Sequence, residues 1–322
     1  MSVPLAAPSI AGKPRRIQEV PQIMKQGWLT PWLYLAPALI VMTTFIIYPT
    51  LNTIYLSVRN INGTDWATAA CEAGQQCWGL LENFRYALTS PVMQIAFFNN
   101  IVWILLMVTS CVVLGLLIAL LANRVRYESV AKSIIFLPMA ISFVGAGVIW
   151  KFIYNYNPSG QQIGLLNAVV VALGGHAVSW LTTPQVSTIA LIVVGVWMST
   201  GFCMTITSAA IKNVPQDILE AARVDGANAW QTFWSVILPT IMPTLTVVTT
   251  TMVINVLKIF DIVYVMTGGL YNTDVIATRM YQEQYNNFNT GRAAAIAVVL
   301  IIVVLPAMYM NLRRFINEER GR

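Results

Sequence analysis

Six long apolar stretches constrain this chain more than any other feature, because a helix needs about 20 apolar residues to cross a hydrocarbon core. Within lipid, every backbone polar group must find a protein partner, so an apolar stretch of this length is expected to be helical. The stretches are residues 32–58, 96–121, 133–154, 185–209, 245–265 and 293–310. The sequence therefore predicts an all-α integral membrane protein with six transmembrane helices.

The composition also favours a membrane protein. Of 322 residues, 57% are hydrophobic and only 10% are charged, whereas soluble domains carry about 25% charged residues. A net charge of +6 is compatible with nucleic-acid binding, but the basic residues are scattered at the ends of the apolar stretches, not gathered on one face. We therefore expect membrane lipid around the chain and no nucleic-acid partner.

The distribution of basic residues predicts the orientation. Six crossings place both termini on the same side, and cytoplasmic loops are enriched in Lys and Arg. The side that holds the termini, with Arg124, Arg126 and Lys212, carries about twice as many basic residues as the side that holds Arg85 and Arg279. We therefore expect both termini, and the loop after the fourth crossing, to be cytoplasmic.

This topology divides the chain into four segments. Residues 1–30 are rich in proline and basic side chains and are expected to form a disordered cytoplasmic tail, and residues 31–94 hold the first transmembrane helix and a periplasmic loop. Residues 95–312 form the core transmembrane domain, and residues 313–322 form a cytoplasmic C-terminal tail. The first apolar stretch is too long to be the core of a signal peptide. Residues 163–173 are apolar but too short to span, which is typical of an interfacial helix.

Prolines interrupt two of the predicted crossings. Pro37 and Pro49 are expected to bend the first crossing. Pro138 lies in the third, where neighbouring groups can accommodate a proline. Residues 267–290, before the last crossing, are rich in Asn, Tyr and Gln and are predicted to form a polar loop.

The segment after the fourth crossing predicts a helix, a sharp corner and a second helix. Pro215 suits a first helical position, where a backbone N–H has no helical partner, and Asp217 places negative charge in the first turn. Gly226 is expected to end this helix, because glycine tolerates the left-handed conformation. Asn228 and Gln231 have the spacing of a capping box that opens the second helix.

The same segment resembles the "EAA" signature of permease subunits of binding-protein-dependent ABC importers. That signature is followed at fixed spacing by Gly, Ile and Leu-Pro, and here Val236 stands where the family usually has Ile. The segment also resembles the carbohydrate branch, which includes maltose, trehalose and α-glucoside permease subunits. The residues that carry the resemblance are Glu220-Ala221-Ala222, Asp225-Gly226-Ala227 and Leu238-Pro239.

The resemblance extends over most of the apolar half. Further similar segments lie at residues 136–138, 157–167, 260–269 and 291–295, so that it covers about residues 95–312. The first crossing resembles the family only in general character.

The resemblance implies a type I (MetI-like) permease fold in the bacterial inner membrane. In that family the helix that begins before Glu220 is a coupling helix, which docks in a cleft of the ATPase subunit and carries its motion into the membrane. Glu220 and Arg223 are spaced to meet on one face of this helix. The alternative is a polar loop with ordinary helix caps.

The implied partners follow from the same resemblance. They are a second homologous permease subunit, an ABC ATPase dimer, and a periplasmic or lipid-anchored solute-binding protein that delivers a sugar. The chain has no Gly-rich loop followed by Lys and Ser or Thr, so it lacks the usual nucleotide-binding loop. We therefore expect a non-catalytic subunit without a cofactor, which relies on a separate ATPase.

Polar residues in the fifth crossing are candidates for the solute path, because charges inside a bilayer are costly and often functional. Asn255, Lys258 and Asp261 are spaced by three residues and are predicted to project from one stripe of a helix. An ion pair between Lys258 and Asp261 is the alternative. Thr249, Thr250 and Thr251 are further polar candidates in this crossing. A sugar needs neutral and aromatic groups, and the candidates for these are Asn255, Tyr264, Asn99, Asn100 and Trp197.

The cysteines and the single histidine indicate no metal site. Cys111 and Cys203 lie in apolar stretches, where cysteine is most simply a small packing residue. Cys71 and Cys77 lie in the first outer loop, where they form either a disulfide or two free thiols. His176 has no ligand partners near it in the sequence, and one histidine alone does not hold a metal.

Two other functions fit the sequence less well than an importer subunit. A self-sufficient secondary transporter usually shows internal repeats and broken helices, and no convincing repeat is found. A membrane enzyme would need clustered histidines or carboxylates at one bilayer face, whereas the acids here are dispersed. The prediction is therefore half of the translocation path for a di- or oligosaccharide, an α-glucoside, or a related glycoside or polyol.

Overall fold

A computed structural model describes residues 29–60, 82–123 and 125–320. The described residues form helices and connecting segments, without strands among them. They belong to two units, Met1–Leu51 and Asn52–Arg322, and each is considered by itself. Most of the predicted N-terminal tail, and both Cys71 and Cys77, lie outside the described residues.

The first unit holds a single apolar helical run. It consists of α1 (Leu29–Met42), a π-helical turn η1 (Thr43–Ile47) and the start of α2 (Tyr48–Ser57), which continues into the second unit. Residues Thr30–Ser57 are long and apolar enough to cross a membrane, as predicted. Large side chains such as Leu33 and Tyr34 are exposed, which suits a helix with lipid around it.

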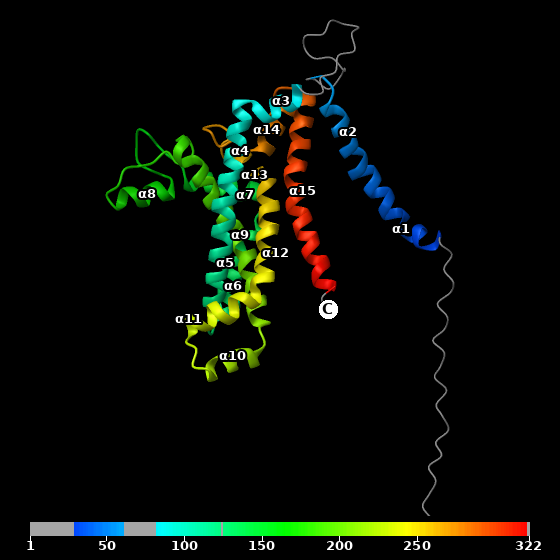
Figure 1. The fold of residues 1–322 in the computed structure, drawn as a ribbon. Helices are drawn as coiled ribbons and strands as arrows, with labels where there is room; N and C mark the ends of the chain where they lie inside the picture. Colours follow the sequence, from blue (N-terminus) through cyan, green and yellow to red (C-terminus); the bar gives the residue numbers. More distant parts are fainter. Residues whose placement is uncertain (1–28, 61–81, 124, 321–322) are drawn as a thin grey trace, which may run out of the picture. The chain divides into compact units, whose positions relative to one another are not determined.

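The second unit contains the remaining helices (Figure 1). On the way to the fourth crossing these are α3 (Glu82–Thr89), α4 (Pro91–Trp103), η2 (Ile104–Val108), α5 (Thr109–Ala122), α6 (Glu128–Phe136), η3 (Leu137–Ala140), α7 (Phe143–Ile153) and α8 (Leu165–Ala172). From the fourth crossing onward they are α9 (Pro184–Lys212), α10 (Gln216–Val224), α11 (Ala229–Thr232), η4 (Phe233–Ile237), α12 (Leu238–Leu257), α13 (Asp261–Met266), α14 (Ile276–Tyr281), η5 (Gln282–Asn286) and α15 (Thr290–Arg320). The short helix predicted at residues 163–173 is confirmed as α8.

Four continuous helical stretches of this unit are long and apolar enough to span. They are Pro91–Ala122, Pro184–Lys212, Ala229–Leu257 and Thr290–Arg313. The third predicted crossing differs, because it is broken into two helices that meet at 98°. With the stretch of the first unit, the described residues therefore provide five spans, or six if the broken pair is one.

The break in the third crossing has a local cause. Pro138 lacks a backbone N–H and cannot continue an α-helical ladder, and it lies in the 3₁₀ turn η3. Ser142 then caps α7 by accepting a hydrogen bond at Oγ from the backbone N–H of Gly145, at 3.0 Å. The neighbouring residues thus accommodate the proline by starting a new helix, and not by continuing a bent one.

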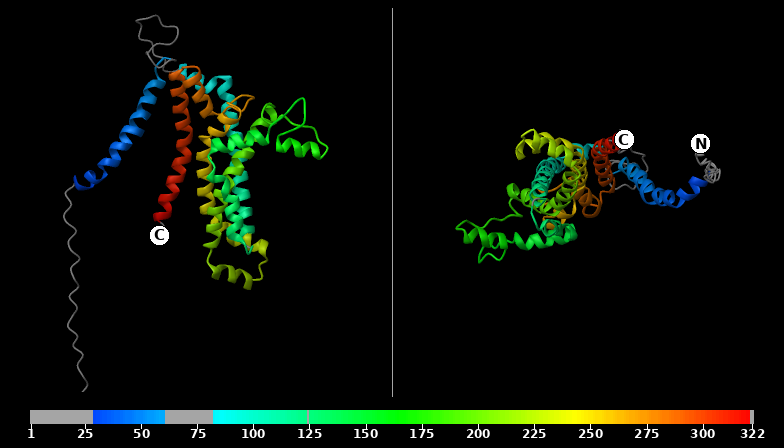
Figure 2. Two further views of the ribbon diagram at one scale, coloured as in Figure 1. Left: turned by 180° about the vertical axis from the view of Figure 1, so that it is seen from behind. Right: turned by 90° about the horizontal axis from the view of Figure 1, so that it is seen from below.

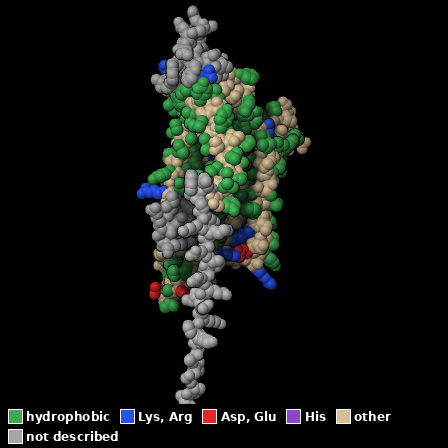
Figure 3. Space-filling view, turned by 90° about the vertical axis from the view of Figure 1, so that its right-hand side faces the viewer, with side chains coloured by type: hydrophobic (Ala, Val, Ile, Leu, Met, Phe, Trp, Pro, Cys, Tyr) green, Lys and Arg blue, Asp and Glu red, His purple; other side chains and the backbone are tan. Residues whose placement is uncertain are grey.

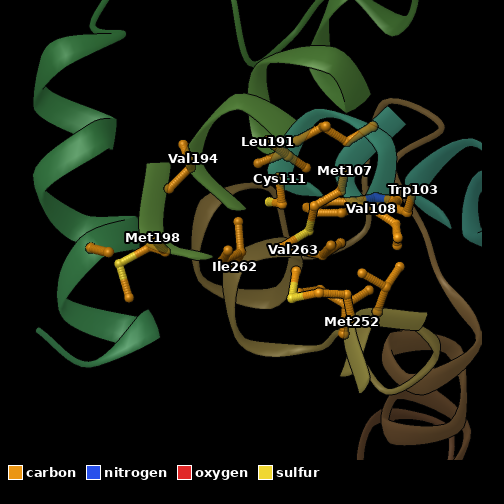
Figure 4. Packing of buried hydrophobic residues seen from close by; sticks show 14 of the residues in the cluster. Trp103, Met107, Val108, Cys111, Leu191, Val194, Met198, Met252, Ile262 and Val263 are labelled. Atoms are coloured by element: carbon orange, nitrogen blue, oxygen red, sulfur yellow. The ribbon is translucent and has the colours of Figure 1, made fainter. Parts of the chain in front are cut away.

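The core of the second unit lies between α5, α9, α12 and α13. Figure 4 shows Trp103, Met107 and Cys111 facing Leu191 and Val263, with Met252 beneath. Gly115 allows the close approach of α5 and α9, since a Cβ there would lie 2.6 Å from that of Cys203. Cys111 and Cys203 are both free and buried, which confirms them as packing residues.

Among the residues that Figure 3 colours by type, hydrophobic and uncharged ones predominate, and few Lys, Arg, Asp or Glu side chains are seen. Figures 1 and 2 place α10 at one end of the second unit and α3 and α14 at the opposite end. The two polar regions considered below therefore lie at opposite ends of the same bundle.

Candidate functional site

The helix α10 is stopped by a left-handed glycine. Gly226 has φ +78°, and the backbone N–H groups of Gly226 and Ala227 donate to the carbonyls of Arg223 and Ala222, at 3.1 and 3.0 Å. This pair of bonds is a Schellman motif, which satisfies carbonyls that have no donor within the helix. The predicted stop at Gly226 is confirmed. Pro215 caps the helix and Gln216 is its first residue, one position later than predicted.

The second helix begins with the predicted capping box. Asn228 Oδ1 accepts from the backbone N–H of Gln231, and Gln231 Oε1 accepts from the backbone N–H of Asn228, both at 2.9 Å. The chain therefore leaves α10 and enters α11 through a corner that is capped on both sides. Two opposing helix caps one residue apart make this corner stiff.

The helix α10 packs on the bundle along one face. Leu219 lies against the apolar cluster of Val214, Ile241 and Leu245, and Ala222 is 9% exposed. Leu238 packs on the same cluster, and Pro239 follows it in the first turn of α12. The helix α10 therefore contacts η4, just before α12, and shares an apolar cluster with the first part of α12.

The opposite face of α10 is exposed and mixed in character. It carries the charged residues Asp217, Glu220 and Arg223. Ile218 and Val224 are also exposed, at 46% and 87%. Glu220 and Arg223 form no ion pair with each other in the described structure, so both charges remain available to a partner.

A polar cluster missed in the sequence anchors the helix that leads into α10. The Glu128 carboxylate forms ion pairs with Lys132 and Lys212. Lys132 also donates to Asn123 Oδ1, at 2.7 Å, and to Ser208. Glu128 and Lys132 have helical i,i+4 spacing, a signal that sequence analysis can detect. The contact with Lys212 depends on the packing of α6 against α9.

The solute-path candidates do not share one helical stripe. The helix α12 ends at Leu257, Lys258 is its C-cap, and α13 begins at Asp261. The prediction of a continuous helix through residues 245–265 was therefore wrong. Phe260 has φ −140° and ψ −58°, which is incompatible with an uninterrupted helix.

The alternative of an ion pair in this crossing is not realised either. Within the described residues, Lys258 and Asp261 form no ion pair. Asn255 and Lys258 are exposed, and Asp261 is half-buried. Thr249, Thr250 and Thr251 each donate to the backbone carbonyl four residues earlier, which accounts for their hydroxyl hydrogens.

Two asparagines considered as sugar ligands have a structural role. Asn99 Nδ2 donates to the carbonyls of Asn272 and Asp274, at 2.6 and 2.8 Å. Asn100 Oδ1 accepts from the backbone N–H of Ile276, at 2.9 Å. Both side chains are at most 5% exposed, so they fix the segment before α14 to α4 and are not kept as path residues. Trp197 instead packs against Trp150, with ring centroids 5.6 Å apart.

The segment 267–290 is not the simple polar loop that was predicted. It contains α14 and η5, and Glu283 is only 1% exposed. The Glu283 carboxylate accepts from Tyr86 Oη and Arg279, both at 2.7 Å, and from the side-chain amides of Asn287 and Asn289, at 3.1 and 2.7 Å. A composition rich in Asn and Tyr is equally typical of a loop, so sequence analysis had no signal for this buried acid.

The two acids of this network have opposite pKa shifts. Burial raises the pKa of Asp274 to about 6, against the hydrogen bond from Thr278 and the charge of Arg279. Burial also acts to raise the pKa of Glu283, but the bonds from Asn289 and Tyr86 and the charge of Arg279 outweigh it, so this pKa is lowered. Glu283 is therefore a fixed negative charge, whereas Asp274 titrates in a mildly acidic range.

The described residues hold no cluster of three or more His, Cys, Asp or Glu side chains that could bind a metal ion. His176 is exposed in the segment between α8 and α9. Cys71 and Cys77 lie outside the described residues, so the two predicted alternatives, a disulfide or two free thiols, both stay open.

Comparison with known proteins places the chain in a class of transport proteins. Residues 111–318 match the family of binding-protein-dependent transport system inner membrane components. The chain belongs to this family. It is a multi-pass inner-membrane permease subunit of an ABC importer with the type I permease fold.

Particular relatives agree with this assignment. The chain is 50% identical to the osmoprotective compounds uptake permease protein of Synechocystis over 90% of its length and the whole of the relative. It is 42% identical to the alpha-glucoside transport system permease protein of Rhizobium meliloti, over 91% of this chain and 84% of that one. Among solved structures, a bacterial ABC transporter for the import of alginate is similar with a TM-score of 0.72 and 25% identity, over 89% of this chain and 96% of that chain.

Proposed function

We propose that this chain is the non-catalytic half of an ATP-driven sugar importer and that α10 is its coupling helix. The observation that carries the proposal is the capped, exposed helix between α9 and α12, with the signature residues around its stop at Gly226. Its outer face offers both charge and apolar surface, at Glu220 and Val224, as a docking cleft on an ATPase would require. The predicted roles of Ala221, Ala222, Asp225, Ala227, Leu238 and Pro239 belong to the same proposal.

The mechanism uses both ends of the α10 segment. Closure of an ATPase dimer displaces α10, and the apolar cluster on which Leu219 packs, which includes Ile241 and Leu245 of α12, carries this displacement to α12. At the other end, Lys212 ties α9 to α6 through Glu128. The bundle then changes from an inward-facing to an outward-facing state, and the solute-binding protein and ATP must favour the same state for import to proceed.

The partners in this proposal are a second permease subunit, an ATPase dimer and a solute-binding protein. The structurally similar alginate transporter was solved with a pentasaccharide-bound periplasmic protein, which supports this type of partner. In this arrangement the termini and α10 are cytoplasmic. The boundaries between the N-terminal tail, the first helix with its periplasmic loop, the core transmembrane domain and the C-terminal tail lie near residues 30, 94 and 312. ATP hydrolysis is assigned to the separate ATPase.

The proposed solute is a neutral polyhydroxylated compound. The relatives are named for osmoprotective compounds, alpha-glucosides and, in Thermococcus litoralis at 28% identity, trehalose and maltose. Asn255, Lys258, Asp261 and Tyr264 are kept as path residues because they are at least partly exposed at the outer end of the fifth crossing. Glycosides and polyols share the hydroxyl groups that such side chains bind.

The test is reconstitution with and without partners. The chain, co-expressed with a second permease, an ATPase and a binding protein from the same organism, should co-purify with the second permease and the ATPase. It should import labelled α-glucoside only with ATP. Uptake by the chain alone in a solute gradient would instead indicate a secondary transporter. Failure to bind any ATPase while α10 remains folded would contradict the coupling role.

A further inference from the structure

Four aromatic rings form a continuous cluster at the outer end of the fifth crossing. This outer aromatic cluster consists of Phe260, Tyr264, Tyr281 and Tyr285. Phe260 and Tyr264 stack with centroids 5.1 Å apart, Tyr264 and Tyr281 are 4.7 Å apart, and Tyr281 and Tyr285 are 4.6 Å apart. Segments that are distant in the sequence, α13 and α14–η5, thus contribute to one aromatic surface.

The cluster is not part of a hydrophobic core. Tyr264 is 39% exposed and Tyr285 is 61% exposed, while Phe260 and Tyr281 are half-buried. The hydroxyls of Tyr264 and Tyr281 make only one long contact with each other, at 3.4 Å. Tyr285 Oη has no hydrogen-bond partner in the described part of the chain. The tyrosines therefore combine exposed ring area with hydroxyls that can still bind a ligand.

The position of the cluster connects it to the solute path. Asn255 and Lys258 are exposed polar residues in and at the end of a spanning helix, and such residues face water or a protein partner instead of lipid. Phe260 follows two residues after Lys258, at the start of α13, and Tyr264 of the cluster is itself one of the proposed path residues.

The chemistry around the cluster favours a neutral ligand with hydroxyl groups. A cavity of about 190 Å³ adjoins Tyr281 and Tyr285. Its other lining residues are the neutral polar Thr53, Gln284 and Thr290 and the apolar Leu56, Met280, Ala293, Ala294 and Ala297. None of the described residues that line it is charged. A sugar ring has an apolar face of C–H groups and an edge of hydroxyls, which matches aromatic rings beside neutral amide and hydroxyl groups.

We propose that the outer aromatic cluster is a stacking platform for a sugar ring at the outer mouth of the translocation path. The sugar lies with its C–H face on Tyr281 or Tyr285 and passes from there to Tyr264 and Asn255. This proposal rests on the proposed function, since it names where the imported sugar first contacts the permease.

The direct test is saturation-transfer NMR with maltose as the probe, on the purified complex of the full chain with its permease and ATPase partners and without the binding protein. Transfer from the protein to the sugar C–H protons is expected. The variants Tyr281→Ala and Tyr285→Ala should reduce it roughly threefold to tenfold, the range expected for loss of one aromatic contact. Tyr309→Ala is the matched control, because Tyr309 is similarly exposed, at 64%, but lies on α15.

Further variants separate ring stacking from structural effects. Tyr285→Phe keeps the ring and should retain most of the transfer, and Tyr285→Ala should leave co-purification of both partners unchanged. Equal transfer in wild type and in both alanine variants would overturn the proposal. Loss of the second permease subunit from the Tyr→Ala variants would also overturn it and assign the cluster to a subunit interface.

The outcome is distinguishable from failure of the proposed function. If the complex assembles and imports maltose but the cluster variants import it at the wild-type rate, only the stacking platform is wrong. If no partner binds and no sugar is imported by the wild-type chain, the proposed function itself has failed.

Discussion

Substitution of Gly226 tests whether the capped corner after α10 transmits force. Gly226 has φ +78°, and a Cβ added there would meet no atom within 4 Å. A side chain is therefore not excluded by space, and its cost is backbone strain alone. An L-residue in the left-handed conformation costs about 1–2 kcal/mol, which corresponds to roughly a 5- to 30-fold fall in the ratio of capped to uncapped corner. A β-branched residue is expected to cost more.

Gly174 provides a matched control in the same chain. It has φ +85°, and a Cβ added there would also have nothing within 4 Å, but it follows α8, away from α10. Gly174→Ala and Gly226→Ala should therefore lower the unfolding temperature by similar amounts. ATP-driven uptake by proteoliposomes should fall for Gly226→Ala only, by at most roughly 30-fold, and Gly226→Asn should retain more activity, because asparagine tolerates this conformation.

Two results would refute this reasoning. Wild-type uptake by Gly226→Val would show that the corner need not keep its left-handed cap. An equal loss of uptake in Gly174→Ala would show that the effect is one of general stability. In both cases the amount of inserted protein must match that of the wild type.

The remaining predictions concern single side chains and their contacts. Glu220→Lys should reduce co-purification of the ATPase at least several-fold while membrane insertion is unchanged, and retention of the ATPase would contradict the docking role. Asn255→Ala should lower uptake without altering assembly, whereas unchanged uptake removes this residue from the path. Glu128→Gln loses the ion pairs with Lys132 and Lys212. It should lower uptake more than it lowers ATP hydrolysis, when both are measured in the same proteoliposomes. A parallel fall in uptake and hydrolysis would argue against a coupling role for Glu128. Burial raises the pKa of Asp274 from 3.8 to about 6, so the folded protein binds this proton more tightly than the unfolded chain. The stability of the fold should therefore increase as the pH falls through 6 towards 4, by roughly 3 kcal/mol at most. A thermal-unfolding series over this pH range should show a smaller increase for Asp274→Asn.

The sequence alone was sufficient for the class of protein and for the corner after α10. Long apolar stretches have one structural solution in lipid, and helix caps depend on a few neighbouring backbone groups. The stop at Gly226 and the capping box of Asn228 and Gln231 were therefore predicted correctly, to within a residue or two. The signature around Glu220 led to the family for the same reason, because it is a local pattern.

The path residues show where local reasoning ended. Spacing by three residues places Asn255, Lys258 and Asp261 on one stripe only if the helix continues, and it ends at Leu257. In the same way, Pro138 was expected inside a crossing, whereas the chain turns by 98° near it, at the 3₁₀ turn that contains this proline. A spacing rule cannot detect such a break, since it assumes the regular backbone that it is used to predict.

Only the tertiary structure decided which polar residues are structural and which are exposed. Asn99 and Asn100 looked like ligands, but they hold the segment before α14 through backbone groups more than 170 residues away in the chain. Glu283 looked like part of a loop, but it is buried where Tyr86 and Arg279 meet it. These contacts join segments that helix packing brings together. Their free energy therefore depends on the three-dimensional arrangement, and the residues that make them follow no periodic pattern in the sequence.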